Sequence, residues 1–271
     1  SLAVVFLARK WLTRTPRAIQ GTLLFLLLAL ACEQTIHYRQ DEKKFTKPED
    51  VTSSVEYKAA VWVKRNLPGD RVFLPGSIAQ WANAFTDVPQ FAGGSFTMST
   101  NLAQRLGKET IFWNSGPQVA LSWLKAYGTV AIAISEPKSK EYWHPFTAPA
   151  KLEGVMQTLW SEDGVAICRV PVREPGLAHV IPETAIVRVA PRSGDEAGLR
   201  KYVAALDDAG LPLTQFAWAG RNRVRIHTTV GSGQVVSLQI SYHAGWHATS
   251  GGRPLRIQKD GLGLMWMHTS C

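Results

Sequence analysis

Cysteine is scarce in this chain of 271 residues, and its placement excludes several kinds of site. The three cysteines are Cys32, Cys168 and Cys271, and no CxxC pair occurs. The sequence therefore contains no zinc or dithiol redox motif. Cys32 lies in a hydrophobic run. This leaves two open interpretations of Cys168: a disulfide with Cys271 in an oxidising compartment, or a buried free thiol.

Acidic residues are missing from the start of the chain, since none precedes Glu33. The same stretch holds four basic residues, namely Arg9, Lys10, Arg14 and Arg17. The formal net charge of the whole chain is +9, but the other basic residues are spread out. No Lys/Arg tract alternates with aromatic residues, so we do not expect the chain to bind nucleic acid.

Sequence signatures of common catalytic centres are also missing. No GxSxG is present, and Gly93-Gly94-Ser95 has too few glycines and no following lysine to form a P-loop. The acidic pairs Glu162-Asp163 and Asp207-Asp208 are sequence neighbours whose side chains diverge, so we predict solvated turns rather than acid/base pairs. The sequence therefore assigns no catalytic residue within this chain.

No metal site or cofactor is expected either. His243 and His247 have the spacing of a helical zinc pair, but Gly245 between them predicts a turn. The remaining histidines are scattered along the chain.

The one long hydrophobic run reads AIQGTLLFLLLALAC and covers Ala18–Cys32. As a helix it spans about 22 Å, and flanking residues such as Trp11 and Ile36 lengthen it toward the roughly 30 Å of a bilayer core. The run is apolar on every face, which is typical of a transmembrane helix. Because its N-terminal flank is purely basic, we expect the chain after residue 36 to lie outside the cytoplasm.

A cleaved signal peptide is the alternative interpretation of this segment. It would have the same basic start and short apolar core, and LALAC resembles a poor lipoprotein processing site. The opening SLAVVFLA favours a membrane segment instead, because it resembles the end of an earlier apolar span. Residues 1–36 are then predicted as the end of one span, a basic cytoplasmic loop and one transmembrane helix, with the lipid bilayer as a partner.

The rest of the chain is predicted to be a linker at 37–53 and two subdomains. The first, 54–175, has the helix–strand–helix rhythm of an α/β unit. Its expected helices are 54–67, 77–85, 102–112 and 117–127, and its expected strands are 71–74, 129–135 and 164–171. Ser53 or Ser54 is placed to cap the first helix.

The second subdomain, 176–271, is predicted to be β-rich. A strand is expected at 185–191 and a helix at 195–206. From Gln215 onward, short strands separated by Gly-rich turns favour an antiparallel, sandwich-like fold. The fold class is therefore α+β, with an N-terminal transmembrane helix, an α/β-type subdomain and a β-sandwich-like subdomain.

One segment has the composition of a sugar-binding site. Aromatic rings stack on the apolar face of a sugar, while amides and carboxylates bind its hydroxyls. The candidate residues are Trp81, Asn83, Asp87, Gln90, Gly93 and Gly94. A purely structural loop remains the alternative. Trp218, Trp246 and Trp266 are likewise open to two interpretations, as core residues or as a carbohydrate platform.

Two segments, 66–94 and 239–266, resemble the soluble C-terminal region of large bacterial membrane proteins. These are the YfhO-like and related polytopic proteins of the GT-C glycosyltransferase type. The most recognisable part is the pattern YxxGWxAxxxG…DGLG, formed by Tyr242, Gly245, Trp246, Ala248, Gly252, Asp260, Gly261 and Gly263.

The resemblance implies a role in transferring sugars from a polyprenyl-phosphate carrier to a glycan acceptor of the bacterial cell envelope. In such enzymes the catalytic acid lies on an early loop between transmembrane helices, so no catalytic residue carries over to this chain. The chain would assist substrate binding or act as a scaffold. The alternative is a non-catalytic, membrane-anchored envelope module that binds glycan or protein.

Overall fold

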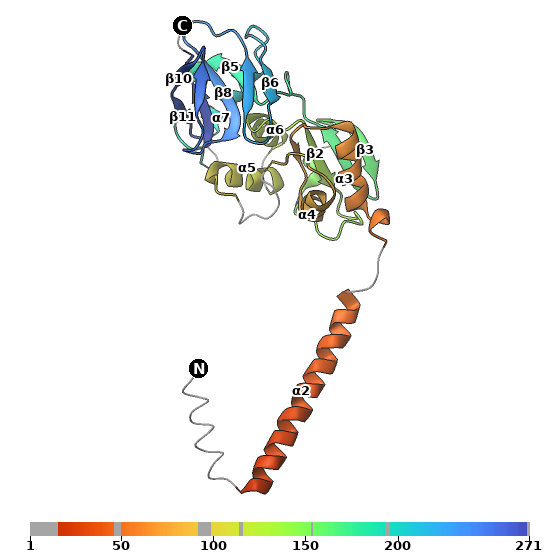
Figure 1. The fold of residues 1–271 in the computed structure, drawn as a ribbon. Helices are drawn as coiled ribbons and strands as arrows, with labels where there is room; N and C mark the ends of the chain where they lie inside the picture. Colours follow the sequence, from red (N-terminus) through yellow and green to blue (C-terminus); the bar gives the residue numbers. More distant parts are fainter. Residues whose placement is uncertain are drawn as a thin grey trace. The chain divides into compact units, whose positions relative to one another are not determined.

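The computed structural model describes residues 16–45, 50–91, 99–113, 116–152, 154–192 and 196–269. The chain divides into two units, Ser1–Asp50 and Val51–Cys271, and the described part of the first unit is a single helix, α2 (Arg17–Phe45; Figure 1). The basic loop and the earlier apolar span predicted before Thr15 lie outside the described residues, as do linker positions 46–49.

Helix α2 confirms the predicted apolar helix. It is the one helix in the described part of the chain that is long and apolar enough to cross a membrane, over Arg17–Lys43. Its large apolar side chains, such as Phe25 and Leu27, are exposed rather than packed into a core. The helix continues to Phe45, into the segment predicted as a linker, because no glycine or proline interrupts the sequence between Gln34 and Pro48.

The second unit contains five α-helices among its described residues. They are α3 (Val55–Asn66), α4 (Gly76–Phe85), α5 (Leu102–Phe112), α6 (Pro117–Ala126) and α7 (Ala197–Leu206). Short 3₁₀ turns cover Val51–Ser53, Pro149–Leu152 and Glu183–Ala185. As predicted, Ser54 caps α3, and its hydroxyl accepts a hydrogen bond from the Tyr57 backbone N–H.

The first sheet has the strand order β1-β2-β4-β3. Its strands are β1 (Val72–Phe73), β2 (Ala131–Ser135), β3 (Gln157–Glu162) and β4 (Val165–Arg169). β1 pairs parallel to β2, and the other pairs are antiparallel. One face packs on α3 and α4 through residues such as Ala133 and Ile167, whereas Ile132 and Cys168 lie in the core on the other face.

The second sheet is antiparallel, in the order β11-β12-β8-β5. Its strands are β5 (Ala178–Pro182), β8 (Gln234–Ser241), β11 (Ile257–Lys259) and β12 (Leu264–Met267). Two hairpins accompany it, β6 (Gln215–Trp218) with β7 (Val224–His227), and β9 (Ala248–Ser250) with β10 (Arg253–Leu255).

The two faces of this sheet pack against different partners. On one face, Val235 of β8 and Trp266 of β12 share a core with Tyr202 of α7. On the other face, residues such as Val236 and Met265 pack against apolar side chains of both hairpins. The C-terminal part of the unit is therefore layered as helix, sheet and hairpins, which agrees with the sandwich-like prediction.

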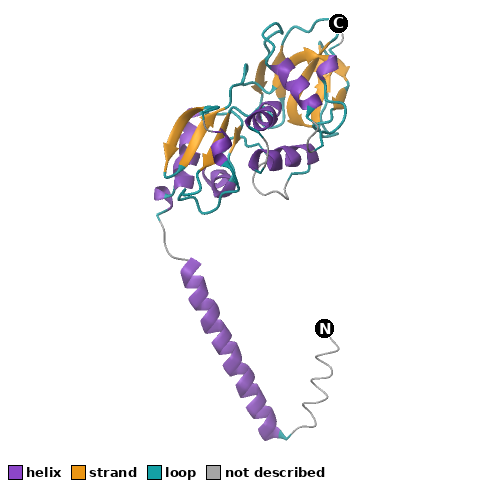
Figure 2. Ribbon diagram, turned by 180° about the vertical axis from the view of Figure 1, so that it is seen from behind, coloured by secondary structure: helices purple, strands orange, loops and turns teal. Residues whose placement is uncertain are grey.

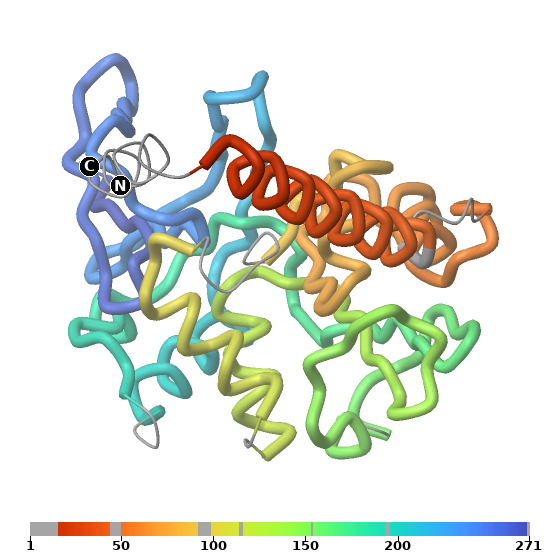
Figure 3. The backbone as a smooth tube through the Cα atoms, turned by 90° about the horizontal axis from the view of Figure 1, so that it is seen from below, coloured from red at the N-terminus to blue at the C-terminus, as the bar shows by residue number. Residues whose placement is uncertain are grey.

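One hydrophobic core joins the two sheets. It contains Phe73 and Ile132 from the first sheet, Trp123 of α6, and Leu264 and Trp266 from the second. Figure 2 shows helices between the two sheets, and Figure 3 shows the yellow α5 and α6 between the green and the blue parts of the chain. The predicted boundary between subdomains at residue 175 stays a prediction.

The predicted strand at 185–191 is wrong. Ile186 and Val187 are buried, but they lie in irregular chain after a 3₁₀ turn, and the Val187 carbonyl accepts a hydrogen bond from Gly261 N. The strand lies earlier, at β5, where it takes the free edge of β8. Cys168 is a buried free thiol, and Cys271 lies outside the described residues.

Candidate functional site

The predicted sugar-binding residues lie on α4 and in the chain that follows it. Gln90 donates from Nε2 to Oδ1 of Asn83 across 2.9 Å, so these two amides are brought together. Asp87 is exposed in the loop between them. Gly93 and Gly94 lie outside the described residues.

Trp81 faces a different side of α4. Its ring stacks on Phe85 one turn later, with centroids 5.8 Å apart, and Tyr57 meets Phe85 edge-on at 4.9 Å. Asn83 is two residues from Trp81, which is about 200° around a helix. The indole ring and the paired amides therefore do not converge in the described residues, and the sugar-binding role of this segment stays a prediction.

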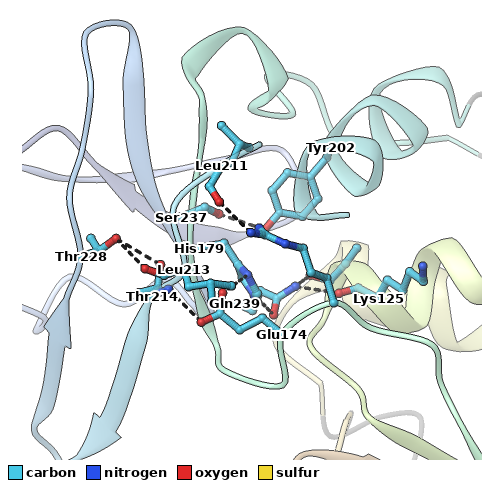
Figure 4. Close-up of polar contacts among 12 residues, drawn as sticks. Lys125, Glu174, His179, Tyr202, Leu211, Leu213, Thr214, Thr228, Ser237 and Gln239 are labelled. Carbon is cyan, nitrogen blue, oxygen red and sulfur yellow. Dashed lines mark hydrogen bonds and ion pairs between the residues drawn. The ribbon is translucent and has the colours of Figure 1, made fainter. Parts of the chain in front are cut away.

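A polar crevice lies where α6, α7, β5 and β8 meet (Figure 4). The polar side chains that line it are Lys125, Arg173, Glu174, His179, Asp207 and Gln239. The space open to the centre of a water-sized molecule is about 10 Å³. A crevice of this size holds about one water molecule, so a sugar does not fit.

Gln239 fixes the protonation of His179. Its Nε2 donates to the carbonyls of Lys125 (2.7 Å) and Ala126 (3.1 Å), which leaves Oε1 as an acceptor. His179 Nε2 lies 3.0 Å from that Oε1 and must therefore be the N–H donor. In the neutral ring, Nδ1 then carries a lone pair.

Glu174 lies beside the His179 ring. Its Oε2 lies 3.8 Å from His179 Nδ1, beyond hydrogen-bond distance, while its Oε1 accepts from Thr214 N at 2.8 Å. Burial raises the pKa of Glu174 and lowers the pKa of His179, so both changes favour the neutral forms. The two side chains therefore lie close together as neutral groups without a direct hydrogen bond between them.

The cations of the crevice already have partners. Lys125 Nζ pairs with Asp207 Oδ2 at 2.6 Å, which ties α6 to the end of α7. Arg173 donates to the Leu211 carbonyl at 2.7 Å. Because these charges are satisfied within the protein, the crevice supports a structural role and does not offer an open site for an anion.

Arg71 joins the two sheets beside the crevice. Its Nη1 donates to the carbonyls of Tyr127 (2.8 Å) and Gln239 (2.5 Å). Burial lowers the pKa of Arg71 to about 10, so the guanidinium remains charged at neutral pH. One buried cation therefore holds together the carbonyl just after α6 and a carbonyl of β8.

A second buried polar cluster lies at the N-terminus of α4. Glu56 and Glu141 are 5% and 6% exposed, and both contact the hydroxyl of Ser77, at 2.8 and 3.2 Å. Glu141 also accepts from Ile78 N and from the Ser135 hydroxyl. Paired carboxyls of this kind suit acid/base chemistry, but their burial closes them to a substrate.

Hydrogen counting assigns a proton to this cluster. The Ser77 hydroxyl has one hydrogen and faces one oxygen of each carboxyl. Glu56 Oε1 also accepts from Tyr142 N, so every contact is satisfied when Ser77 donates to Glu56 and Glu141 donates to Ser77. Burial raises the pKa of Glu141 to about 7, which agrees with this assignment.

Sequence reasoning missed both clusters. Glu56 had a signal, because it precedes Ala59, Ala60 and Val63 at helical spacing and therefore shares their buried face. Glu141 and Glu174 lie in irregular chain, where no periodicity marks a buried residue. His179 lies in an apolar strand, and its hydrogen-bond partner Gln239 lies 60 residues further along the chain.

In comparisons with protein-family models, with curated proteins and with solved structures, no match to this chain was found.

Proposed function

We propose that this chain is the extracytoplasmic C-terminal region of an integral membrane glycosyltransferase. The enzyme would act on cell-envelope glycans with a polyprenyl-phosphate-linked sugar donor, and this region would assist substrate binding or act as a scaffold. The observation that carries the proposal is α2, whose apolar stretch is exposed and long enough to cross a bilayer. The basic flank before α2 supports an extracytoplasmic folded unit.

The residues of the family-like pattern support the proposal by their position. Asp260 accepts from Leu264 N at 2.7 Å, and Gly263 accepts from Tyr242 N at 2.8 Å, so the pattern builds the turn between β11 and β12. These residues therefore have a structural place in the C-terminal sheet. A turn-forming pattern of this kind supports a shared fold, but it does not identify the substrate of the enzyme.

A non-catalytic envelope module that binds glycan or protein is the second candidate. It is favoured by the burial of the acidic groups in the described residues. The Glu56–Glu141 pair is enclosed, and the crevice at Glu174 takes about one water molecule. Neither cluster can admit a sugar, so catalysis would have to come from another part of the parent protein.

Topology mapping of the full-length protein tests the location. Thr249→Cys, on exposed β9, should react with a membrane-impermeant maleimide in intact cells, whereas Thr15→Cys, before α2, should react only after permeabilisation. The unsubstituted full-length protein, which keeps its natural cysteines, is labelled in parallel to measure the background. The reverse pattern of labelling would overturn the extracytoplasmic assignment.

Transfer of a lipid-linked sugar tests the activity. Full-length protein in proteoliposomes should transfer the sugar, and deletion of residues 51–271 should reduce transfer while leaving the membrane part inserted. Loss of transfer on deletion supports the glycosyltransferase. No transfer by either protein, together with retained binding of glycan by the folded unit, would favour the second candidate.

Within that assay, Trp81→Ala and Asp87→Ala test the predicted sugar-binding segment. Both side chains are exposed, so each variant should lose transfer by several-fold and shift the unfolding midpoint little. Trp113→Ala, on a similarly exposed tryptophan at the end of α5, is the control. Full activity in both variants would leave the segment with a structural role alone.

A further inference from the structure

One long stretch of the second unit contains no acidic residue. Between Asp208 and Asp260 the sequence has neither Asp nor Glu. Its basic residues are Arg221, Arg223, Arg225, Arg253, Arg256 and Lys259. This stretch forms β6 to β11, and therefore both hairpins that accompany the second sheet.

Folding places the two hairpins of this stretch in one layer, whereas β8 and β11 belong to the second sheet. Phe216 and Ile226 of the first hairpin, and Ala248 and Leu255 of the second, pack on the same apolar face of the sheet. Both hairpins thus cover one side of the molecule, and many of their other side chains are exposed. We call the exposed arginines at 221, 223, 225, 253 and 256 the basic outer layer.

Strand β7 carries the most regular part of this layer. Arg223, Arg225 and His227 alternate with inward-facing Val224 and Ile226, so they project from one face. Across the hairpin, the residues paired with Arg225 and His227 are Ala217 and Gln215, which are uncharged. The arginines of the layer have no ion-pair partner within the described ranges.

We propose that the basic outer layer binds a linear acidic glycan, a polymer that bears carboxylate or phosphate groups. The inference rests on the proposed function, because it names the chemical class of the glycan recognised by the extracytoplasmic unit. The cations are arginines, whose planar guanidinium binds carboxylate or phosphate through two parallel hydrogen bonds. Arg223 and Arg225 follow each other at a strand repeat of about 7 Å, so successive anionic groups can be bound along one line.

The composition of the outward face favours a polymer over a bilayer surface. A segment that binds at a membrane interface presents apolar side chains that enter the lipid. The outward positions of the first hairpin hold instead Gln215, Ala217, Arg223, Arg225 and His227. Trp218 does not belong to this outward face, because it pairs with inward-facing Val224 and its ring meets Phe216 edge-on with centroids 5.7 Å apart.

Binding of labelled polygalacturonate to the full chain in nanodiscs of neutral lipid tests the proposal. The double substitution Arg223→Gln/Arg225→Gln should raise the Kd by about tenfold, and the variant should show a weaker dependence of Kd on salt than the wild type. Neutral dextran of the same length should not bind. The matched control is Arg105→Gln/Arg200→Gln, which removes two exposed arginines from helices α5 and α7.

Two outcomes would overturn the proposal. One is an equal loss of binding in the control, which would show attraction to net charge alone. The other is stronger binding to vesicles with anionic phosphatidylglycerol than to polygalacturonate, with the same dependence on Arg223 and Arg225. Sugar transfer is measured in a separate assay, and a full-length protein without transfer activity would overturn the glycosyltransferase proposal. The polygalacturonate binding measurement would still decide the role of the arginines.

Discussion

The start of α4 depends on a single residue with no side chain. Gly76 adopts φ +69°, and a Cβ built there would lie 2.1 Å from Glu141 Oε1 and 2.3 Å from the Trp143 carbonyl. Glycine alone combines this backbone conformation with such a close approach. The buried Glu56–Glu141 cluster can form because Gly76 leaves room for it.

Gly76→Ala should therefore destabilise the fold by at least about 2 kcal/mol. Gly69→Ala is the matched control, because Gly69 also has a positive φ, +81°, but nothing lies within 4 Å of its added Cβ. The control should cost only about 1 kcal/mol. Urea denaturation of the two variants measures the difference, and equal costs would show that the contact with Glu141 is unimportant.

Glu141 should make stability depend on pH. Burial raises the pKa of its carboxyl from 4.5 to about 7, so the folded state keeps a proton that the unfolded state releases above about pH 4.5. The free energy of unfolding should be highest below that pH and should fall by about 3 kcal/mol as the pH rises to 7.

Glu141→Gln mimics the protonated carboxyl and should remove most of this fall. Part of the slope should remain, because burial also raises the pKa of Asp260 to about 7, which acts in the same direction. Denaturation curves recorded at several pH values between 4.5 and 7.5 measure the slope. A variant with the slope of the wild type would contradict the assignment of the proton to Glu141.

Among the elements, α5 shows how a cap joins distant parts of the chain. Asn101 Oδ1 accepts from Ala103 N and Gln104 N, and its Nδ2 donates to the Leu262 carbonyl at 2.9 Å. The cap therefore starts the helix and also anchors the turn between β11 and β12. A helix on one side of the core depends in this way on a loop near the end of the described chain.

Asn101→Ala should cost about 2 kcal/mol, since it removes a cap and also one of the two hydrogen bonds to the Leu262 carbonyl, the other coming from the Tyr127 hydroxyl. Ser54→Ala at α3 is the control, because its side chain caps the helix through Tyr57 N alone and reaches no distant strand. It should cost about 1 kcal/mol. Thermal unfolding compares the two, and a smaller loss for Asn101→Ala would argue against the double role.

Element prediction from the sequence succeeded where local signals were strong. Pro117 at the start of α6 and Gly128 after its end frame that helix, and Asp163-Gly164 forms the turn between β3 and β4, with φ +51° and +78°. The prediction at 185–191 was wrong because apolar alternation shows burial but not pairing. β5 and β12 already occupy both edges of β8, so Ile186 and Val187 are buried without joining the ladder.

For the whole molecule, α2 decides where the folded unit resides. Leu26→Arg puts a charge near the middle of the apolar stretch, at a cost of about 3 kcal/mol for membrane insertion. The variant should be extracted from membranes by alkaline carbonate more readily than the wild type, when expressed without any preceding span. Gln34→Arg, past the apolar stretch, should remain in the membrane, and equal extraction of both would argue against an anchor.

The candidate sites show the limit of sequence reasoning at this scale. The segment of Trp81 and Gln90 was found from composition, but composition does not tell that Trp81 and Asn83 point to different sides of α4. Glu174 and His179 are close in the sequence, but Gln239, which fixes the His179 ring, lies 60 residues further along the chain. The basic outer layer was hidden because its arginines look dispersed in the sequence, and it emerges only when two hairpins cover the same face of a sheet.

The sequence by itself determined the apolar helix, the α+β class and most of the helices, because these follow from hydrophobic runs, periodicity and capping residues that act over a few positions. Tertiary structure alone decided which carboxyls are buried, which proton they share and which arginines stand together. Those properties arise from the low dielectric environment and the exact neighbours that packing creates between residues far apart in the chain.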